Sequence, residues 1–251
     1  MCFMGETRVT SNRFAIAAFA VAAAASGLAY AQAPTPPAAR PPAAPPAGAR
    51  PPAVAENPQR AGLLWKEEWR QNTDGKEGPI NLASSVRNPD LELKLYGPGP
   101  ALNVLGKDND DGNPSHVFSG EAKGPMALAW RNKKGMADLS GLSRLRVNTK
   151  MSGLHQLYPI VKLASGDWYM ATWSTHGSIK DWVIEEIPLS DVRWIKLDIA
   201  NVVTKGNPLD KIDLTKVEEI GFADLLPASG HGPGGWFDLG LVEVYGKAVA
   251  R

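Results

Sequence analysis

Hydrophobic and polar residues alternate with a period of two along much of the chain after residue 62. In the run Leu91–Tyr96, leucines hold the odd positions, and Glu92, Lys94 and Tyr96 hold the even ones. Neighbouring side chains of a β-strand point to opposite faces of the sheet. This period therefore predicts strands that bury one face and expose the other.

Further runs either alternate in this way or are short and apolar, and turn residues such as Ser165-Gly166-Asp167 separate them. They are Ser115–Gly120, Met126–Arg131, Ser143–Lys150, Leu154–Leu163, Trp168–Trp173, Trp182–Leu189 and Trp194–Ile199. The run around Leu63 fits either a first strand or a short helix, since Trp65 and Trp69 are four residues apart. Many short strands with almost no long helical period predict an all-β fold, an antiparallel β-sandwich.

Two final runs, Val217–Leu226 and Trp236–Tyr245, flank a loop rich in Gly, Pro and Ser. In the second run Phe237, Leu239 and Leu241 share one parity, which predicts that all three are buried. We expect these runs to be the closing strands of the sandwich.

The N-terminus has the pattern of an export signal. Arg8 and Arg13 precede the apolar run Phe14–Leu28, and Ala29-Tyr30-Ala31 fits a small-x-small cleavage site. We therefore expect residues 1–31 to be a signal peptide and the protein to be exported, to the periplasm or the extracellular space. The alternative is a retained membrane anchor, although the apolar run is short for a full span.

Charge and cysteine content bear on the disulfides and the binding partners that we expect. The single cysteine, Cys2, lies inside the predicted signal peptide, so we expect no disulfide in the mature chain. The full chain carries a formal charge of +1, and loss of residues 1–31 would leave it neutral. Because the chain has no basic excess, we do not expect nucleic acid to be a partner.

Residues 32–61 form an Ala/Pro-rich segment that cannot build a core. Such a composition favours an extended polyproline II conformation or disorder, so we expect a linker here. It is either a spacer that holds the domain away from a surface or a tail without a role. The β-sandwich domain is then expected over residues 62–247.

A loop at Lys107–Pro114 concentrates carboxylates. Asp108, Asp110 and Asp111 lie close together before Gly112, and hard cations such as Ca²⁺ prefer oxygen ligands of this kind. The spacing does not fit an EF-hand, because no glutamate stands at the required position. The loop is therefore a candidate calcium site, and the alternative is an acidic turn in which Asp and Asn cap local backbone groups.

Five segments in order, DLSGLSRLRV, WYMATW, WVIEEIPLSDVRW, LTKVEEIGFADLL and GWFDLGLVEVYG, resemble the galactose-binding-like jelly rolls. In this order of elements the chain is similar to carbohydrate-binding modules and to domains of the complex I intermediate-associated protein 30 type. The chain also resembles exported bacterial proteins of unassigned function that occur beside sugar-degrading enzymes. This resemblance implies a jelly-roll β-sandwich, often with a structural calcium ion, and a face or loop edge that binds an oligo- or polysaccharide.

A sugar site needs flat aromatic rings together with polar groups that hydrogen-bond hydroxyls. Two strands with polar alternation and the nearby tryptophans supply such groups, which we expect to meet on the concave face of the sandwich. The candidate ligand-binding residues are Arg146, His155, Gln156, Lys162, Trp168 and Trp182. For each tryptophan the alternative is core packing, and for His155 it is a buried, hydrogen-bonded role.

Two other functions stay open. The first is a sugar-active enzyme, a glycoside hydrolase or lyase, with His155, Glu185 or Asp224 as acid or base. Asp224 and Asp238 lie on the two closing runs, where they can face each other. The second is a structural or protein-interaction module. Because the sequence contains no G-x-S-x-G, P-loop or H-E-x-x-H motif, non-catalytic carbohydrate binding is the preferred hypothesis.

Overall fold

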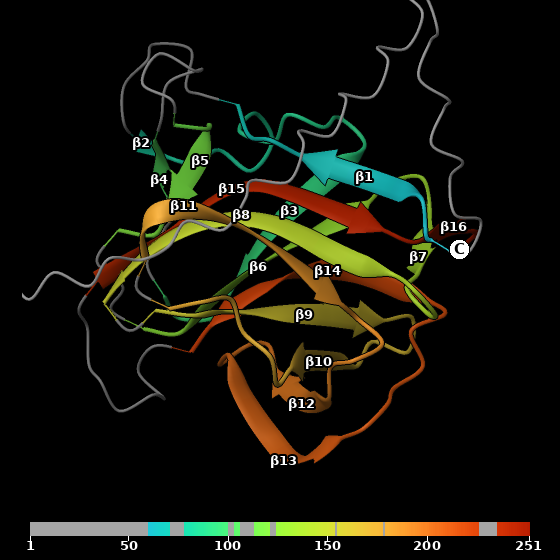
Figure 1. The fold of residues 1–251 in the computed structure, drawn as a ribbon. Coiled ribbons are helices and arrows are strands. Elements are labelled where there is room, and N and C mark those ends of the chain that lie inside the picture. The colour runs from blue at the N-terminus through green and yellow to red at the C-terminus, as the bar shows by residue number, and fades with distance from the viewer. Residues whose placement is uncertain are drawn as a thin grey trace, which may run out of the picture. The chain divides into compact units, whose positions relative to one another are not determined.

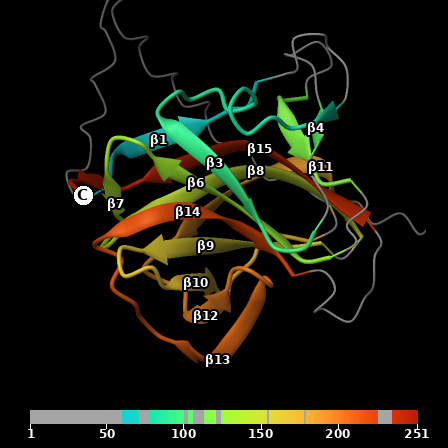
Figure 2. The ribbon, with the colours of Figure 1, turned by 180° about the vertical axis from the view of Figure 1, so that it is seen from behind.

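The computed structural model describes residues 60–70, 78–99, 103–105, 113–120, 124–153, 155–177, 179–225 and 235–251. These residues form two antiparallel β-sheets that pack face to face (Figures 1 and 2). The predicted all-β sandwich is confirmed. No described segment is a helix with the length and apolar character needed to cross a membrane.

Sheet A contains seven of the described strands. Its order is β11 (Ile179–Pro188), β8 (Arg144–Gly153), β15 (Gly235–Tyr245), β5 (His116–Phe118), β4 (Asn103–Leu105) and β2 (Gly78–Pro79), and β1 (Leu63–Glu67) pairs with the C-terminal half of β15. The run around Leu63 is therefore a strand, as one of the two alternatives predicted.

Sheet B contains the other described strands. Its order is β13 (Val203–Leu209), β12 (Trp194–Asp198), β10 (Trp168–Ala171), β9 (Leu157–Leu163), β14 (Val217–Asp224), β6 (Met126–Asn132) and β3 (Leu91–Tyr96), and β7 (Met136–Asp138) with β16 (Lys247–Val249) joins at β14. The two closing strands do not pair with each other, because β14 lies inside sheet B and β15 lies inside sheet A (Figure 1).

The core lies between the sheets and follows the period of two. Its large side chains include Leu145, Val147, Phe237 and Leu239 from sheet A and Leu157, Val161, Ile220 and Phe222 from sheet B. The prediction for Leu241 is wrong, because this residue is half-buried and Val242 takes the buried position. The register between β15 and β8 shifts between Leu239 and Val242, and such a β-bulge reverses the parity beyond it.

Candidate functional site

The outer face of sheet B, which points away from the core, has an apolar floor. Ala129 of β6, Gly221 of β14 and Ile160 of β9 lie side by side across three neighbouring strands. A Cβ atom added at Gly221 would lie 1.9 Å from the carbonyl oxygen of Leu128. Glycine is therefore required here, because the backbones of β14 and β6 leave no room for a larger residue.

Two aromatic rings meet above this floor. Tyr96 projects from β3 and Trp168 from β10, and their ring centroids are 5.1 Å apart in an edge-to-face arrangement. Three strands separate β3 from β10 in the sheet, so in a flat sheet these strands would lie about 19 Å apart. The contact between the rings therefore shows that sheet B curves toward this face, which makes the face concave.

Glu219 lies on the same face and is 1% exposed. Its carboxylate accepts hydrogen bonds from Lys94 Nζ at 3.0 Å, Lys162 Nζ at 3.2 Å and the Tyr96 hydroxyl at 2.5 Å. Burial raises the pKa of Glu219, but these three hydrogen bonds outweigh burial and hold the pKa below its ordinary value. We call these four residues the Glu219 cluster, and its central carboxylate is ionised at neutral pH.

The same contacts also shift the pKa values of Lys162 and Tyr96. Burial lowers the pKa of Lys162, but its hydrogen bonds to Glu218 and Glu219 outweigh this and raise it. Burial and the contact with Glu219 both raise the pKa of Tyr96 far above its ordinary value. Tyr96 is therefore a neutral donor and Lys162 is a cation, so the site presents a charged donor and a charged acceptor side by side.

A third aromatic side chain extends the face toward the end of the sandwich. Tyr158 of β9 is half-buried, lies opposite Ala223 of β14, and donates its hydroxyl to Gln156 Oε1 at 2.8 Å. The concave face thus combines three aromatic side chains with amide, carboxylate and ammonium groups.

The structure brings some of the predicted ligand residues together and separates others. Gln156 and Lys162 lie on or beside the concave face of sheet B. Trp168 is on the same face but is buried in an apolar cluster, as its core-packing alternative predicted. Arg146 and Trp182 belong to β8 and β11 of sheet A. The prediction that Arg146, Gln156 and Lys162 share one face is therefore wrong, because the chain crosses from one sheet to the other between β8 and β9.

Three members of the Glu219 cluster were missed by the sequence reasoning, which named only Lys162. Lys94 and Tyr96 do occupy the polar parity of their strand, which was recognised as exposed. Glu219 and Asp224 are charged residues in the mostly buried strand β14, and a charge in a buried run is a usable signal of a paired site.

Arg146 and Trp182 have structural partners on the outer face of sheet A. Arg146 Nη1 lies 3.2 Å from Glu243 Oε2. Trp182 Nε1 donates to Asn113 Oδ1 at 2.9 Å, and its ring packs 5.1 Å from the ring of His116. These contacts engage both side chains within sheet A, away from the Glu219 cluster.

Beside Trp182, a buried carboxylate faces a histidine. His116 Nε2 lies 3.8 Å from Asp238 Oδ1, and Asp238 is 6% exposed. Burial raises the pKa of Asp238 to about 7, and only Lys150 opposes this effect. Burial lowers the pKa of His116. Asp238 points outward from sheet A and Asp224 inward from sheet B, so the idea that these two carboxylates face each other is wrong.

His155 lies between the two sheets and is fully buried, as one of its two alternatives predicted. Its Nδ1 atom lies 2.6 Å from Asp224 Oδ2, and its Nε2 atom has no hydrogen-bond partner among the described residues. Glu185, the other acid–base candidate, accepts hydrogen bonds from the backbone amide of His176 at 3.2 Å and also contacts its ring. The three candidates therefore do not converge, since Glu185 faces a different partner.

The candidate calcium ligands Asp108, Asp110 and Asp111 lie outside the described residues. Within the described ranges, no group of three or more His, Cys, Asp or Glu side chains is placed to hold a metal ion. Calcium binding by this loop stays a prediction.

No protein-family description matches the chain, and no curated protein sequence matches it. Among solved structures it is similar to the family 11 carbohydrate-binding module of the cellulosomal cellulase Lic26A-Cel5E of Clostridium thermocellum, with 15% identity, a TM-score of 0.43, and coverage of 70% of this chain and 98% of that one. A family 11 module from the same organism, in complex with a β-1,3-1,4-mixed-linked tetrasaccharide, matches with 15% identity, a TM-score of 0.42 and the same coverage. An exo-β-agarase matches with 10% identity and a TM-score of 0.38, over 73% of this chain and 25% of that one. With TM-scores below 0.5, these likenesses carry no conclusion about the ligand of this chain.

Proposed function

We propose that the concave face of sheet B binds a carbohydrate without cleaving it. Sugars present apolar ring faces that pack on aromatic rings, and hydroxyl groups that both donate and accept hydrogen bonds. Tyr96 and Tyr158 supply the aromatic surface, and the buried ring of Trp168 packs against Tyr96. Gln156 and the charged groups around Glu219 supply the polar contacts.

The observation that carries this proposal is the ionised, nearly fully buried carboxylate of Glu219 beside two lysines on an aromatic face. A buried charge needs partners, and two ammonium groups with one phenol hydroxyl satisfy Glu219 in the free protein. Lys94 and Lys162 keep further donor hydrogens, because each ammonium group has three. These donors are fixed in position before a sugar arrives, which reduces the entropy lost on binding.

The catalytic alternative has one observation in its favour, the 2.6 Å contact between His155 and Asp224 with Nε2 of the ring unpaired among the described residues. Both side chains are buried, at 0% and 2% exposure. An acid–base pair has to come within hydrogen-bond reach of its substrate. Tyr96, Tyr158 and Lys162 on the concave face are partly exposed, so binding there requires less rearrangement than catalysis at this pair, and we prefer it.

Export, cleavage after Ala31 and calcium binding by the Asp108–Asp111 loop are parts of the same proposal. In this picture residues 32–61 act as a spacer, and the sandwich meets its glycan in the periplasm or the extracellular space. A structural calcium ion would act on stability, since a metal that binds only the folded protein raises its unfolding free energy.

Thermal unfolding of the chain with a panel of soluble glycans, each with calcium and with chelator, tests these proposals. A glycan at about 100 times its dissociation constant adds about 2.7 kcal/mol to the unfolding free energy, so its midpoint rises. Product analysis of the same samples separates a binder, which leaves the glycan intact, from an enzyme. If no glycan in the panel raises the midpoint, the carbohydrate proposal fails. A chelator that leaves the midpoint unchanged contradicts the calcium site.

A further inference from the structure

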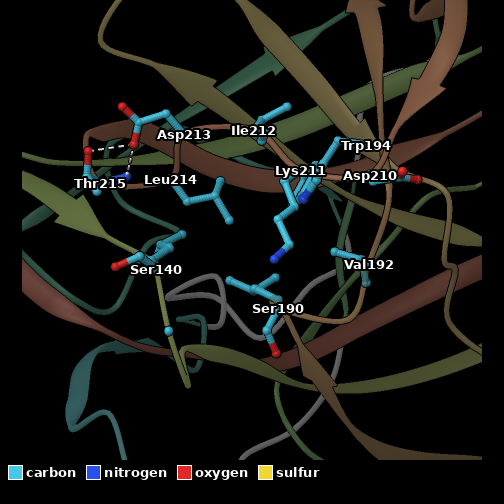
Figure 3. A pocket seen from close by; sticks show the side chains of 13 residues that line it. Ser140, Ser190, Val192, Trp194, Asp210, Lys211, Ile212, Asp213, Leu214 and Thr215 are labelled. Atoms are coloured by element: carbon cyan, nitrogen blue, oxygen red, sulfur yellow. Dashed lines mark hydrogen bonds between the residues drawn. The ribbon is translucent and has the colours of Figure 1, made fainter.

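A pocket of about 300 Å³ lies at the edge of the sandwich, away from the Glu219 cluster (Figure 3). Three connections form its walls: the turn after β7, the turn between β11 and β12, and the segment from β13 to β14. Backbone hydrogen bonds join these walls, from Leu139 N to Leu214 O at 2.8 Å and from Leu189 N to Ser143 O at 3.0 Å. Backbone hydrogen bonds therefore fix the walls of the pocket.

The inner surface of this pocket is apolar. Leu139, Leu189, Val192, Trp194 and Leu214 line it, and each of these side chains is mostly buried. Two exposed leucines are sequence neighbours of residues that line the pocket. Leu142 directly follows a lining residue and is 54% exposed. Leu209 directly precedes another lining residue and is 46% exposed. An apolar pocket with a few polar groups at its mouth is the usual form of a small-molecule site.

The charged groups at the mouth of the pocket differ in whether they already have a hydrogen-bond partner. Asp213 accepts hydrogen bonds from Thr215 N and Oγ1 at 2.9 and 2.6 Å, which lower its pKa. Asp210 accepts a hydrogen bond from Arg193 Nε at 2.8 Å. Lys211 forms no ion pair or side-chain hydrogen bond within the described part of the chain. Both carboxylates are thus engaged, and the ammonium group is free.

Figure 3 shows how these groups are directed. The hydroxyls of Ser140 and Ser190 and the carboxylate of Asp213 point away from the centre of the pocket, whereas the side chain of Lys211 extends across it. The ammonium group is then the charged group that a bound molecule would meet, and the surface below it is hydrocarbon. A molecule that complements both features has an apolar body and a single negative charge.

We propose that this pocket binds a small carboxylic acid with a branched aliphatic or aryl body, which packs on Leu139, Val192 and Leu214 while its carboxylate contacts Lys211 Nζ. The site is separate from the carbohydrate face and shares no residue with it. A neutral isostere of the acid keeps the apolar contacts and loses the charge-assisted hydrogen bond, so it binds about tenfold more weakly.

The test uses the full chain and two matched pairs of probes: phenylacetate with phenylacetamide, and 4-methylpentanoate with 4-methylpentanamide. Methyl resonances of Leu139, Val192 and Leu214 are followed by NMR during each titration. We expect saturable shifts with the acids at millimolar concentration and about tenfold weaker binding of the amides. Lys211→Met should remove the preference for the acid, and Lys211→Arg should retain it.

Lys247→Met is the matched control, because Lys247 is also exposed and lies outside the pocket. This variant should bind the acids like the parent. The proposal is overturned if acid and amide bind equally, if Lys211→Met keeps the preference, or if neither acid shifts the three methyl signals up to about 10 mM. Glycan binding should be unchanged in Lys211→Met, which separates this site from the concave face.

Discussion

The Nδ1 atom of His155 lies 2.6 Å from Oδ2 of Asp224, and both side chains are buried between the two sheets. A carboxylate can only accept a hydrogen bond, so the ring nitrogen donates. His155 lies just before β9 and Asp224 ends β14, its neighbour in sheet B. The pair therefore joins the ends of two adjacent strands where the sheet would otherwise begin to separate.

Asp224→Ala removes one partner of this buried pair. We expect the free energy of unfolding to fall by about 3 kcal/mol, because the imidazole stays buried without its acceptor. Urea unfolding followed by tryptophan fluorescence measures this change. Asp167→Ala, which removes an exposed ion pair with Lys196, is the control and should change stability far less. Similar losses in the two variants would contradict a structural role for the His155 pair.

Lys162→Met tests whether the glycan binds at the Glu219 cluster of sheet B or on the outer face of sheet A. Methionine keeps much of the apolar length of the side chain and removes its charged donor, so glycan affinity should fall about tenfold. Arg146→Met makes the matching change on sheet A and should leave affinity unchanged. Isothermal titration with the glycan identified by thermal unfolding provides the measurement. Equal effects of the two variants would move the binding site away from the concave face.

Asp238 makes the stability of the protein depend on pH. Its pKa is raised from 3.8 to about 7 in the folded state, so the folded protein holds this proton more tightly than the unfolded chain. Its contribution to stability is fully present below about pH 4 and is lost as the pH rises through about 7. Asp238→Asn cannot lose a proton, so the variant should gain stability relative to the parent over this range.

At pH 8 we expect Asp238→Asn to exceed the parent in unfolding free energy by on the order of 1 kcal/mol or more, relative to their difference at pH 4. Chemical unfolding at several pH values measures this difference. Burial lowers the pKa of His116, which opposes the trend in the parent, so only the comparison of the two proteins isolates Asp238. A difference that does not change with pH would mean that Asp238 is ionised normally.

Gly221→Ala tests the close contact between β14 and β6. The added methyl group would meet backbone atoms of Leu128 and Ala129 that cannot rotate away. We expect a loss of about 3 kcal/mol in unfolding free energy, and weaker glycan binding because the floor of the face is displaced. Gly62→Ala, where no atom lies within 4 Å of the added Cβ, is the control. A thermally stable Gly221→Ala protein would contradict the packing described for this face.

The strand pattern was predictable wherever one face of a strand is buried. Leu91–Tyr96 and Met126–Asn132 lie where the alternation or the short apolar run placed strands. β13 (Val203–Leu209) was not predicted, because it is an edge strand whose side chains are mostly exposed and show no alternation. The bulge in β15 was also not predictable from parity, since it depends on register with β8.

The candidate site was predictable only in part, because parity places a side chain on a face without saying which sheet the strand joins. Lys162 and Arg146 both occupy polar positions of consecutive strands, and the sequence offered no reason to separate them. The chain places β8 in sheet A and β9 in sheet B, so their polar faces look in opposite directions. Partners such as Lys94 and Glu219 are 125 residues apart in the chain and meet only through strand order.

The sequence by itself determined that this protein is an all-β sandwich, since alternation is a local property that each strand carries in its own side chains. Tertiary structure alone decided which charges meet. The order of strands in each sheet brings Lys94, Tyr96 and Lys162 to Glu219, and it gathers three distant turns around the pocket beneath Lys211. These contacts depend on long-range pairing, whose register is set by the packing of the whole core and not by any one stretch of residues.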